Sequence, residues 1–285
     1  MNNTDLINFD QKKIDKILKD FHQKGYARLG KITSTKYTKE LMKRVQDLMM
    51  GKIVYKNMFF KLDDPSGNYF NIKHEDLNNE VFSGPSERYK KIKDLEYDPK
   101  FLKVIKSKLI KKIADQLIGS NASSMRAMIL NKSHIKSSIM PFHQDVSENW
   151  SMNGKPTFTL WLSLNGANKK KGCLKVVEGS HKHGVIGDGN NLFNKKLKKK
   201  FLNKKNIKYL TCKPGEALIF SNFTLHGSEK NLTKENRIAF TVCLMDAKIK
   251  NLKSNKTYPK IFGKNSLTQK HISSLKEIPP KVYSV

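Results

Sequence analysis

The chain has 285 residues, a hydrophobic content of 38% and a formal net charge of +30, from 55 Lys and Arg against 25 Asp and Glu. These values fit a folded protein with a sizeable core. No stretch approaches the roughly 18 apolar residues of a membrane span, and the N-terminal stretch lacks the apolar core of a secretory signal. The three cysteines lie far apart, which argues against a disulfide framework and favours a reducing, cytoplasmic compartment.

The positive charge has two interpretations. A basic field of this size attracts anions such as nucleic acid, phosphorylated substrates or acidic lipid headgroups. The lysines are scattered, however, and the chain is rich in Lys, Asn and Ile together, which is the composition expected from an AT-rich genome. The compositional interpretation leaves the low acidic content unexplained, so both stay open.

Helical patterns dominate the first part of the chain. Residues 9–24 place apolar side chains at helical spacing, with Gly25 as a C-cap, and 26–32 then predict a strand. Residues 35–51 predict a second helix. The strongest helical pattern is 98–119, which begins with Asp-Pro and ends at a glycine.

After residue 119 the pattern changes to short strands separated by turns. The predicted strands are 124–130, 137–145, 157–164, 173–179, 207–212, 216–221, 223–228 and 237–245. Regular short strands predict a β-sandwich or barrel.

We therefore expect one domain over 1–285. Its helices, within about 1–119, would pack on a β core of about 120–247, and 248–285 would form a polar tail. Residues 186–206, rich in Lys and Asn, predict a solvated excursion or a mobile lid.

A histidine and an acid lie two residues apart in the stretch PFHQD. Residues i and i+2 of a strand point to the same face, so His143 and Asp145 are predicted to project together, with Gln144 turned away. They are two of the three ligand types of the 2-His-1-carboxylate triad that holds non-haem Fe(II). The third ligand must come from another strand, and His226, which ends an apolar strand, is the best-placed histidine.

Arg237 opens the last predicted strand, 11 residues after His226. A buried arginine at the mouth of a β core needs an anionic partner, and a guanidinium binds a carboxylate in a bidentate manner. A dicarboxylate cosubstrate would satisfy it.

Longer stretches resemble the phytanoyl-CoA dioxygenase family of Fe(II)- and 2-oxoglutarate-dependent oxygenases. They are PFHQD (141–145), TFTLWLSLNGANKKKGCLKVVEGSHKHG (157–184) and GEALIFSNFTLHGSEKNLTKENRIAFT (215–241), and FHQKGYARLGK (21–31) is also typical. The HxD pair alone is a weak signal, whereas its combination in order with the Trp-containing strand, GSHKHG, HGS and a downstream Arg is specific. The family often has Pro where Glu178 stands, which affects a turn rather than the iron site.

The resemblance implies a fold and a cofactor site. The fold would be mainly β with flanking helices, a double-stranded β-helix or jelly roll. The Fe(II) ligands would be His143, Asp145 and His226. Arg237 would pair with the distal carboxylate of 2-oxoglutarate, and Ser228 would hydrogen-bond the same group.

Two further residues would contact the cosubstrate. Trp161 lies on a strand face shared with Thr and Ser residues, which suits a lined cavity, so it would wall the cosubstrate site. Met125 matches a contact position of the family on the preceding strand.

By the family's chemistry, Fe(II), 2-oxoglutarate and O2 would oxidise a C–H bond of a small molecule and release succinate and CO2. The carboxylate at Asp145 favours hydroxylation, with desaturation and ring closure left open. The basic charge favours an anionic substrate, and Lys132 and Lys136 near the mouth are candidate contacts.

Two alternatives remain. The same chemistry could act on a nucleic acid or protein, although no aromatic-and-basic recognition motif is present. The chain could instead be a non-catalytic β-helix binding protein or hold another metal, against which the intact triad and Arg237 count.

Overall fold

Two antiparallel sheets face each other at the centre of the computed structural model, which describes residues 5–63, 81–135, 137–187 and 195–279. The larger sheet has the order β1-β9-β6-β11-β4-β3-β2, with β14 also paired to β4. Its strands are β1 Tyr26–Lys31, β2 Phe60–Leu62, β3 Tyr89–Ile92, β4 Ala122–Lys132, β6 Phe158–Ser163, β9 Glu216–Ser221, β11 Arg237–Asp246 and β14 Lys260–Phe262.

The smaller sheet has the order β5-β10-β7-β8. Its strands are β5 Met140–His143, β7 Leu174–Val177, β8 Ile207–Leu210 and β10 His226–Ser228. From β4 to β11 the chain passes back and forth between the two sheets, which makes a double-stranded β-helix. The predicted fold class is confirmed, and each strand predicted after residue 119 corresponds to one of β4 to β11.

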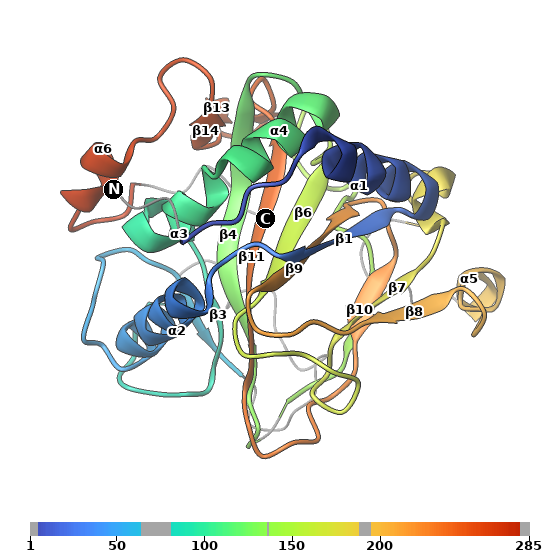
Figure 1. The fold of residues 1–285 in the computed structure, drawn as a ribbon, viewed down its shortest axis with the longest axis horizontal. Helices are drawn as coiled ribbons and strands as arrows, with labels where there is room; N and C mark the ends of the chain where they lie inside the picture. Colours follow the sequence, from blue (N-terminus) through green and yellow to red (C-terminus); the bar gives the residue numbers. More distant parts are fainter. Residues whose placement is uncertain (1–4, 64–80, 136, 188–194, 280–285) are drawn as a thin grey trace.

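Helices cover the larger sheet on the side away from the smaller one. Figure 1 shows α1 (Gln11–Lys24), α3 (Pro99–Ile105) and α4 (Lys108–Leu117) lying over this sheet, with α2 (Thr35–Met49) beside β3. The C-cap predicted at the end of the first helix is confirmed, because Gly25 adopts φ 83° and its N–H donates to the Phe21 carbonyl.

The uninterrupted helix predicted over 98–119 is wrong. The chain leaves helical geometry at Ser107, whose side chain accepts a hydrogen bond from the Ile110 N–H and so caps a second helix. The break turns both short helices so that each buries an apolar face, including Leu102 of α3 and Ile113 of α4.

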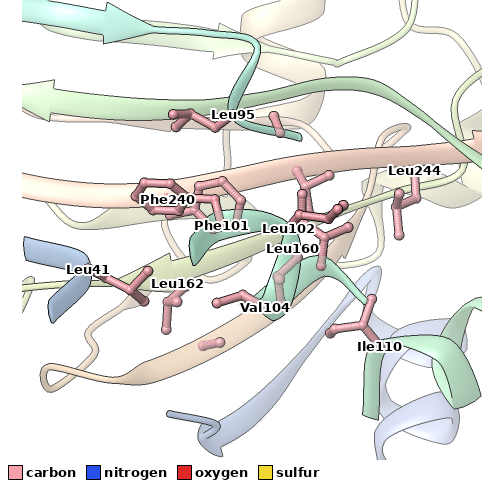
Figure 2. Close-up of a cluster of buried hydrophobic side chains, with 14 of the residues drawn as sticks. Leu41, Leu95, Phe101, Leu102, Val104, Ile110, Leu160, Leu162, Phe240 and Leu244 are labelled. Atoms are coloured by element: carbon pink, nitrogen blue, oxygen red, sulfur yellow. The ribbon is translucent and has the colours of Figure 1, made fainter. Parts of the chain in front are cut away.

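The main hydrophobic core lies between these helices and the larger sheet. Figure 2 shows Phe101 of α3 against Phe240 of β11, with Leu160 and Leu162 of β6 beside them. The rings of Phe101 and Phe240 have centroids 4.7 Å apart. These side chains come from the face of β6 and β11 that points away from the smaller sheet, which leaves the opposite face free to line a cavity.

Two segments differ from their simple expectations. In the Lys/Asn-rich stretch 186–206, α5 (Lys195–Phe201) buries Phe201 near Ile186 and Phe142 against the smaller sheet, and 188–194 lie outside the described residues. After residue 247 the chain is more than the predicted polar tail. It forms β12 (Lys250–Asn251), β13 (Lys256–Thr257), β14 and α6 (Gln269–Ser273), and it places Ile261, Ile272 and Ile278 in the main core. Within the described ranges, no helix has the length and apolar character needed to cross a membrane.

Candidate metal centre

The pairing of β5 with β10 brings the two predicted histidine ligands together. His143 and His226 are register partners, with ring centroids 4.2 Å apart. The strand predicted over 137–145 ends at His143, and Asp145 lies just beyond it, held by a hydrogen bond from its N–H to the Asn222 carbonyl (2.9 Å). The Asp145 carboxylate oxygens lie 3.6 Å from His226 Nε2 and 4.0 Å from His143 Nε2.

Both imidazoles are oriented by backbone carbonyls. Nδ1 of His143 lies 2.8 Å from the Pro141 oxygen, and Nδ1 of His226 lies 2.9 Å from the Thr224 oxygen. With the proton on each Nδ1, the Nε2 lone pairs point toward Asp145 and are available to a metal. Burial lowers the pKa of His143 to about 3, and burial also lowers the pKa of His226, so both rings are neutral near physiological pH.

The carboxylate of this cluster is charged. Burial raises the pKa of the Asp145 carboxyl, but the Arg126 guanidinium and the two histidines lower it by more, so it lies well below its usual range. Arg126 of β4 forms an ion pair with Asp145. An anionic carboxylate and two neutral imidazoles are the protonation states that metal binding requires.

The three donors can surround one ion. Their ligand atoms all lie within 4.8 Å of one another. Two imidazole nitrogens and one carboxylate oxygen on one side of an ion form the facial triad, which suits non-haem Fe(II) and leaves positions open. The residues present therefore fit a ferrous ion.

Arg237 is buried close to these donors, and no carboxylate of the described residues forms an ion pair with it. It is 4% exposed, its Nη1 donates to the Leu130 carbonyl at 3.3 Å, and its Nε finds no acceptor among the described residues. Its guanidinium lies 5.8 Å from the centre of the Trp161 ring. Burial lowers its pKa to about 10, so it remains charged. A buried cation with an unused donor fits the distal carboxylate of 2-oxoglutarate.

The cavity has a volume of about 260 Å³ and lies between the two sheets. Its walls include the three candidate ligands together with Arg237, Trp161 and Ser228. Ser228 lies on β10, two residues after His226. Met125 is placed differently. It lies at a bulge of β4 and packs with Tyr258 and Ile249, and it is not among the described side chains that line this cavity.

Lys132, a predicted substrate contact, does reach the cavity. It stands opposite Arg237 in the β4–β11 pair, and its Nζ donates to the Ser138 carbonyl at 2.6 Å. Burial, together with Arg237, lowers its pKa to about 7. Lys136 lies outside the described residues.

Gln144, predicted to turn away from His143 and Asp145, lies among the residues that line the cavity, but its side-chain amide hydrogen-bonds to backbone groups and not to either candidate ligand. Its Nε2 donates to the Gly184 and Phe223 carbonyls at 2.8 and 2.6 Å, and its Oε1 accepts from the Ile186 N–H at 2.7 Å. These bonds hold the backbone between His143 and Asp145 against two loops, one at 184–186 and the other just before β10.

Arg126 is the site residue that the sequence reasoning missed. It is the one charged side chain in the predicted strand 124–130, which is otherwise apolar or small. A charge in such a strand requires a buried partner, so the signal was present, but its partner Asp145 lies in the loop that follows β5 of the other sheet.

Comparisons with known proteins identify a family and several relatives of this chain. The family model described as phytanoyl-CoA dioxygenase (PhyH) matches residues 21–239. The peroxisomal phytanoyl-CoA dioxygenase of Bos taurus is 25% identical over 174 residues, which cover 57% of this chain and 51% of that protein. Phytanoyl-CoA dioxygenase 1 of Oryza sativa subsp. japonica is 24% identical over 266 residues, covering 81% of this chain and 89% of that protein. The chain spans about half the length of the bovine and human relatives it matches.

Solved structures share the fold at low sequence identity. The epimerase SnoN in complex with Fe3+, alpha ketoglutarate and nogalamycin RO has a TM-score of 0.64 at 14% identity, covering 85% of this chain and 87% of that chain. EctD from S. alaskensis with bound Fe has a TM-score of 0.59 at 18% identity, covering 90% of this chain and 84% of that chain.

Proposed function

This chain belongs to the phytanoyl-CoA dioxygenase family, and from that premise we propose that it is an Fe(II)- and 2-oxoglutarate-dependent dioxygenase that hydroxylates a C–H bond of a small metabolite. His143, Asp145 and His226 would hold Fe(II). Arg237 and Ser228 would bind the distal carboxylate of 2-oxoglutarate. When bound, the metal and cosubstrate supply the activation of O2, coupled to conversion of 2-oxoglutarate to succinate and CO2.

The observation that carries this proposal is the buried Arg237 in the same cavity as the three donors. A metal-binding protein without a dicarboxylate cosubstrate has no use for a guanidinium there, since leaving it without an anion is costly. The joint presence of a His-Asp-His cluster and of an Arg237 Nε that has no acceptor among the described residues therefore supports the oxygenase over a plain metal carrier.

The protein's own groups orient and shield the reaction. Thr224 and Pro141 fix the two imidazole rings through their carbonyls, so the Nε2 atoms keep one direction. The rings of Trp161 and Phe220 wall the cavity beside Arg237 and His226, which keeps water from that side.

The size of the cavity favours a small substrate over a macromolecule. A volume of about 260 Å³ must admit the cosubstrate as well, and His226 and Arg237 are both nearly fully buried. A base in a nucleic acid would have to be extruded deep between the sheets to reach them.

The test is release of succinate from 2-oxoglutarate that depends on added Fe(II), followed by a screen for metabolites that stimulate it. Hydroxylation predicts a product that has gained one oxygen atom by mass spectrometry, whereas desaturation predicts loss of two hydrogens. His143→Ala is the control. Turnover that this variant retains in full would contradict the site assignment, and turnover without Fe(II) would contradict the reaction class.

A further inference from the structure

Three loops meet where β4 ends and β11 begins, and together they form one surface, called here the three-loop surface. The loops are 133–139 between β4 and β5, 164–173 between β6 and β7, and 229–236 between β10 and β11. The Leu232 N–H donates to the Lys170 carbonyl at 2.8 Å, which ties the third loop to the second. The Asn231 N–H donates to the Ser137 hydroxyl at 2.8 Å, which ties the third loop to the first.

Large apolar side chains are exposed on this surface. Leu232 is 78% exposed, Ile135 63% and Ile139 43%. The backbone beside them is fixed, because Asn231 is buried and its side-chain amide donates to the Lys132 carbonyl at 3.0 Å. Several exposed aliphatic side chains on loops that are bonded to one another indicate a surface that contacts another apolar phase.

The same loops carry an excess of positive charge. Their two acids already form ion pairs with lysines, Glu229 with Lys175 and Glu235 with Lys171. Four further lysines on these loops are exposed, and no ion pair of theirs is found among the described residues: Lys169, Lys170, Lys230 and Lys234. The three-loop surface therefore combines aliphatic side chains with ammonium groups that protein carboxylates do not neutralise.

This combination fits the surface of an anionic lipid bilayer. There, aliphatic side chains enter the acyl boundary while ammonium groups stay with the phosphates of the headgroups. A single-stranded nucleic acid would call for aromatic side chains on which bases stack, and the three loops contain no Phe, Tyr or Trp. A protein partner is less well matched, since protein interfaces are enriched in aromatic residues and Arg and depleted in Lys.

We propose that the three-loop surface binds anionic phospholipid at a bilayer surface, with Ile135 and Leu232 inserted at the acyl boundary. Ile139 lies between Ser138 and Met140, which line the cavity, so the docked surface adjoins one wall of the cavity. Binding of lipid here does not depend on the dioxygenase function proposed above.

Flotation of the full chain with phosphatidylcholine vesicles, with and without about one third phosphatidylglycerol, measures this binding. At an ionic strength of about 0.15 M, charges farther apart than about 8 Å are screened, so a local cluster of lysines counts for more than charge dispersed over the chain. The wild type should bind the anionic vesicles at least about tenfold more tightly than the neutral ones, because several lysines act together on the anionic surface.

A pair of substitutions tests the apolar contribution. Ile135→Ser with Leu232→Ser should weaken binding to the anionic vesicles about tenfold or more, because both side chains lose their acyl contact. Val54→Ser with Leu252→Ser is the matched control, since it removes two exposed apolar side chains outside the three loops, and it should bind as the wild type does.

A second pair tests the local charge. Lys170→Gln with Lys230→Gln should weaken binding by a similar factor. Lys253→Gln with Lys256→Gln, at the β12–β13 turn, removes the same net charge and should not. Figure 1 shows β13 and β14 near the start of β4, whereas the three loops adjoin its end. All of these side chains are exposed, so the midpoint of urea denaturation should be unchanged, and a loss of binding then does not come from misfolding.

Equal binding of the two kinds of vesicle by the wild type would overturn the proposal, as would equal weakening in the loop variants and in their matched controls. A third outcome would identify a nucleic-acid surface in place of a lipid one. In that case Lys170→Gln with Lys230→Gln loses binding, Ile135→Ser with Leu232→Ser keeps it, and the wild type retains a single-stranded oligonucleotide in a lysine-dependent manner.

Discussion

Arg126 of β4 forms an ion pair with Asp145, the acidic member of the cluster that His143 and His226 complete. The carboxylate proposed to hold the metal is thus neutralised by a protein cation from the larger sheet, while both imidazoles belong to the smaller one. This pair links the larger sheet to the loop that follows β5 at the candidate metal centre. Its contribution to the stability of the metal-free protein and the further stabilisation by a bound metal can be measured separately.

Replacing Arg126 with Gln should destabilise the metal-free protein by about 2 kcal/mol, because it leaves the Asp145 charge partly buried without its partner. Metal binding should then stabilise the variant more than it stabilises the wild type, since the ion becomes the main countercharge. Urea denaturation with and without Mn(II) measures both effects. Arg44→Gln, which breaks a pair with the buried Asp98 (3.5 Å), is the control and should leave the metal-induced increment unchanged. An equal increment in the wild type and Arg126→Gln would count against the countercharge role.

Replacing His226 with Ala should lower the affinity for Fe(II) by more than about 100-fold, because even residues that only orient a ligand are worth about 10- to 100-fold. Anaerobic calorimetric titration measures it directly. His271→Ala, an exposed histidine on α6, is the matched variant and should bind as the wild type does. If His226→Ala bound Fe(II) with unchanged affinity, the ion would have to sit elsewhere.

Arg237 offers a test of the cosubstrate. Arg237→Lys keeps a charge but loses the planar fork, so KM for 2-oxoglutarate should rise about tenfold, and Arg237→Gln should raise it about 100-fold or more. The assay is Fe(II)-dependent succinate formation, and Fe(II) affinity should be preserved in both variants. Arg28→Lys, whose parent donates to the Thr211 carbonyl on the surface, should leave KM unchanged. A common KM for all variants would show that the cosubstrate carboxylate binds another group.

Local patterns predicted most of the strands, because period-two alternation and turn residues act over a few neighbours. They also placed His143 and Asp145 on one side of the chain. The approach of His226 depends on the pairing of β5 with β10, which no local pattern encodes. Its position at the end of an apolar strand made it the best-placed histidine, and the family resemblance supported that choice.

The features that could not be predicted from the sequence depend on contacts between distant residues or on a local hydrogen bond that interrupts a continuous pattern. Arg126 could be read as out of place in an apolar strand, but its partner Asp145 lies in the loop that follows β5 of the other sheet. In the stretch 98–119 the helical periodicity continues across Ser107, so the pattern did not reveal that its hydroxyl caps a new helix.

A buried carboxyl outside the cavity predicts a specific dependence of stability on pH. Glu96, in a 3-10 turn at Leu95–Tyr97, is 2% exposed, and one of its oxygens accepts a hydrogen bond from the Ala127 N–H at 3.2 Å. Burial, followed by repulsion from Asp94, raises its pKa from 4.5 to about 8. Between these two values the folded state holds a proton that the unfolded state has released, so the free energy of unfolding must fall as pH rises.

The contribution of Glu96 is fully present below the unfolded pKa and is lost by about pH 8. Its size is on the order of 5 kcal/mol, from a shift of the pKa from 4.5 to about 8. Glu96→Gln should therefore match the wild type near pH 5 and exceed its stability near pH 9, as measured by urea denaturation across this range. Other titrating groups cancel in the difference between the two proteins. Glu40→Gln, which removes an ion pair with Lys100 near the surface, should give a difference without this rise. A wild-type-minus-variant difference that stays constant for Glu96→Gln would mean that the buried carboxyl is ionised in the folded state at all these pH values.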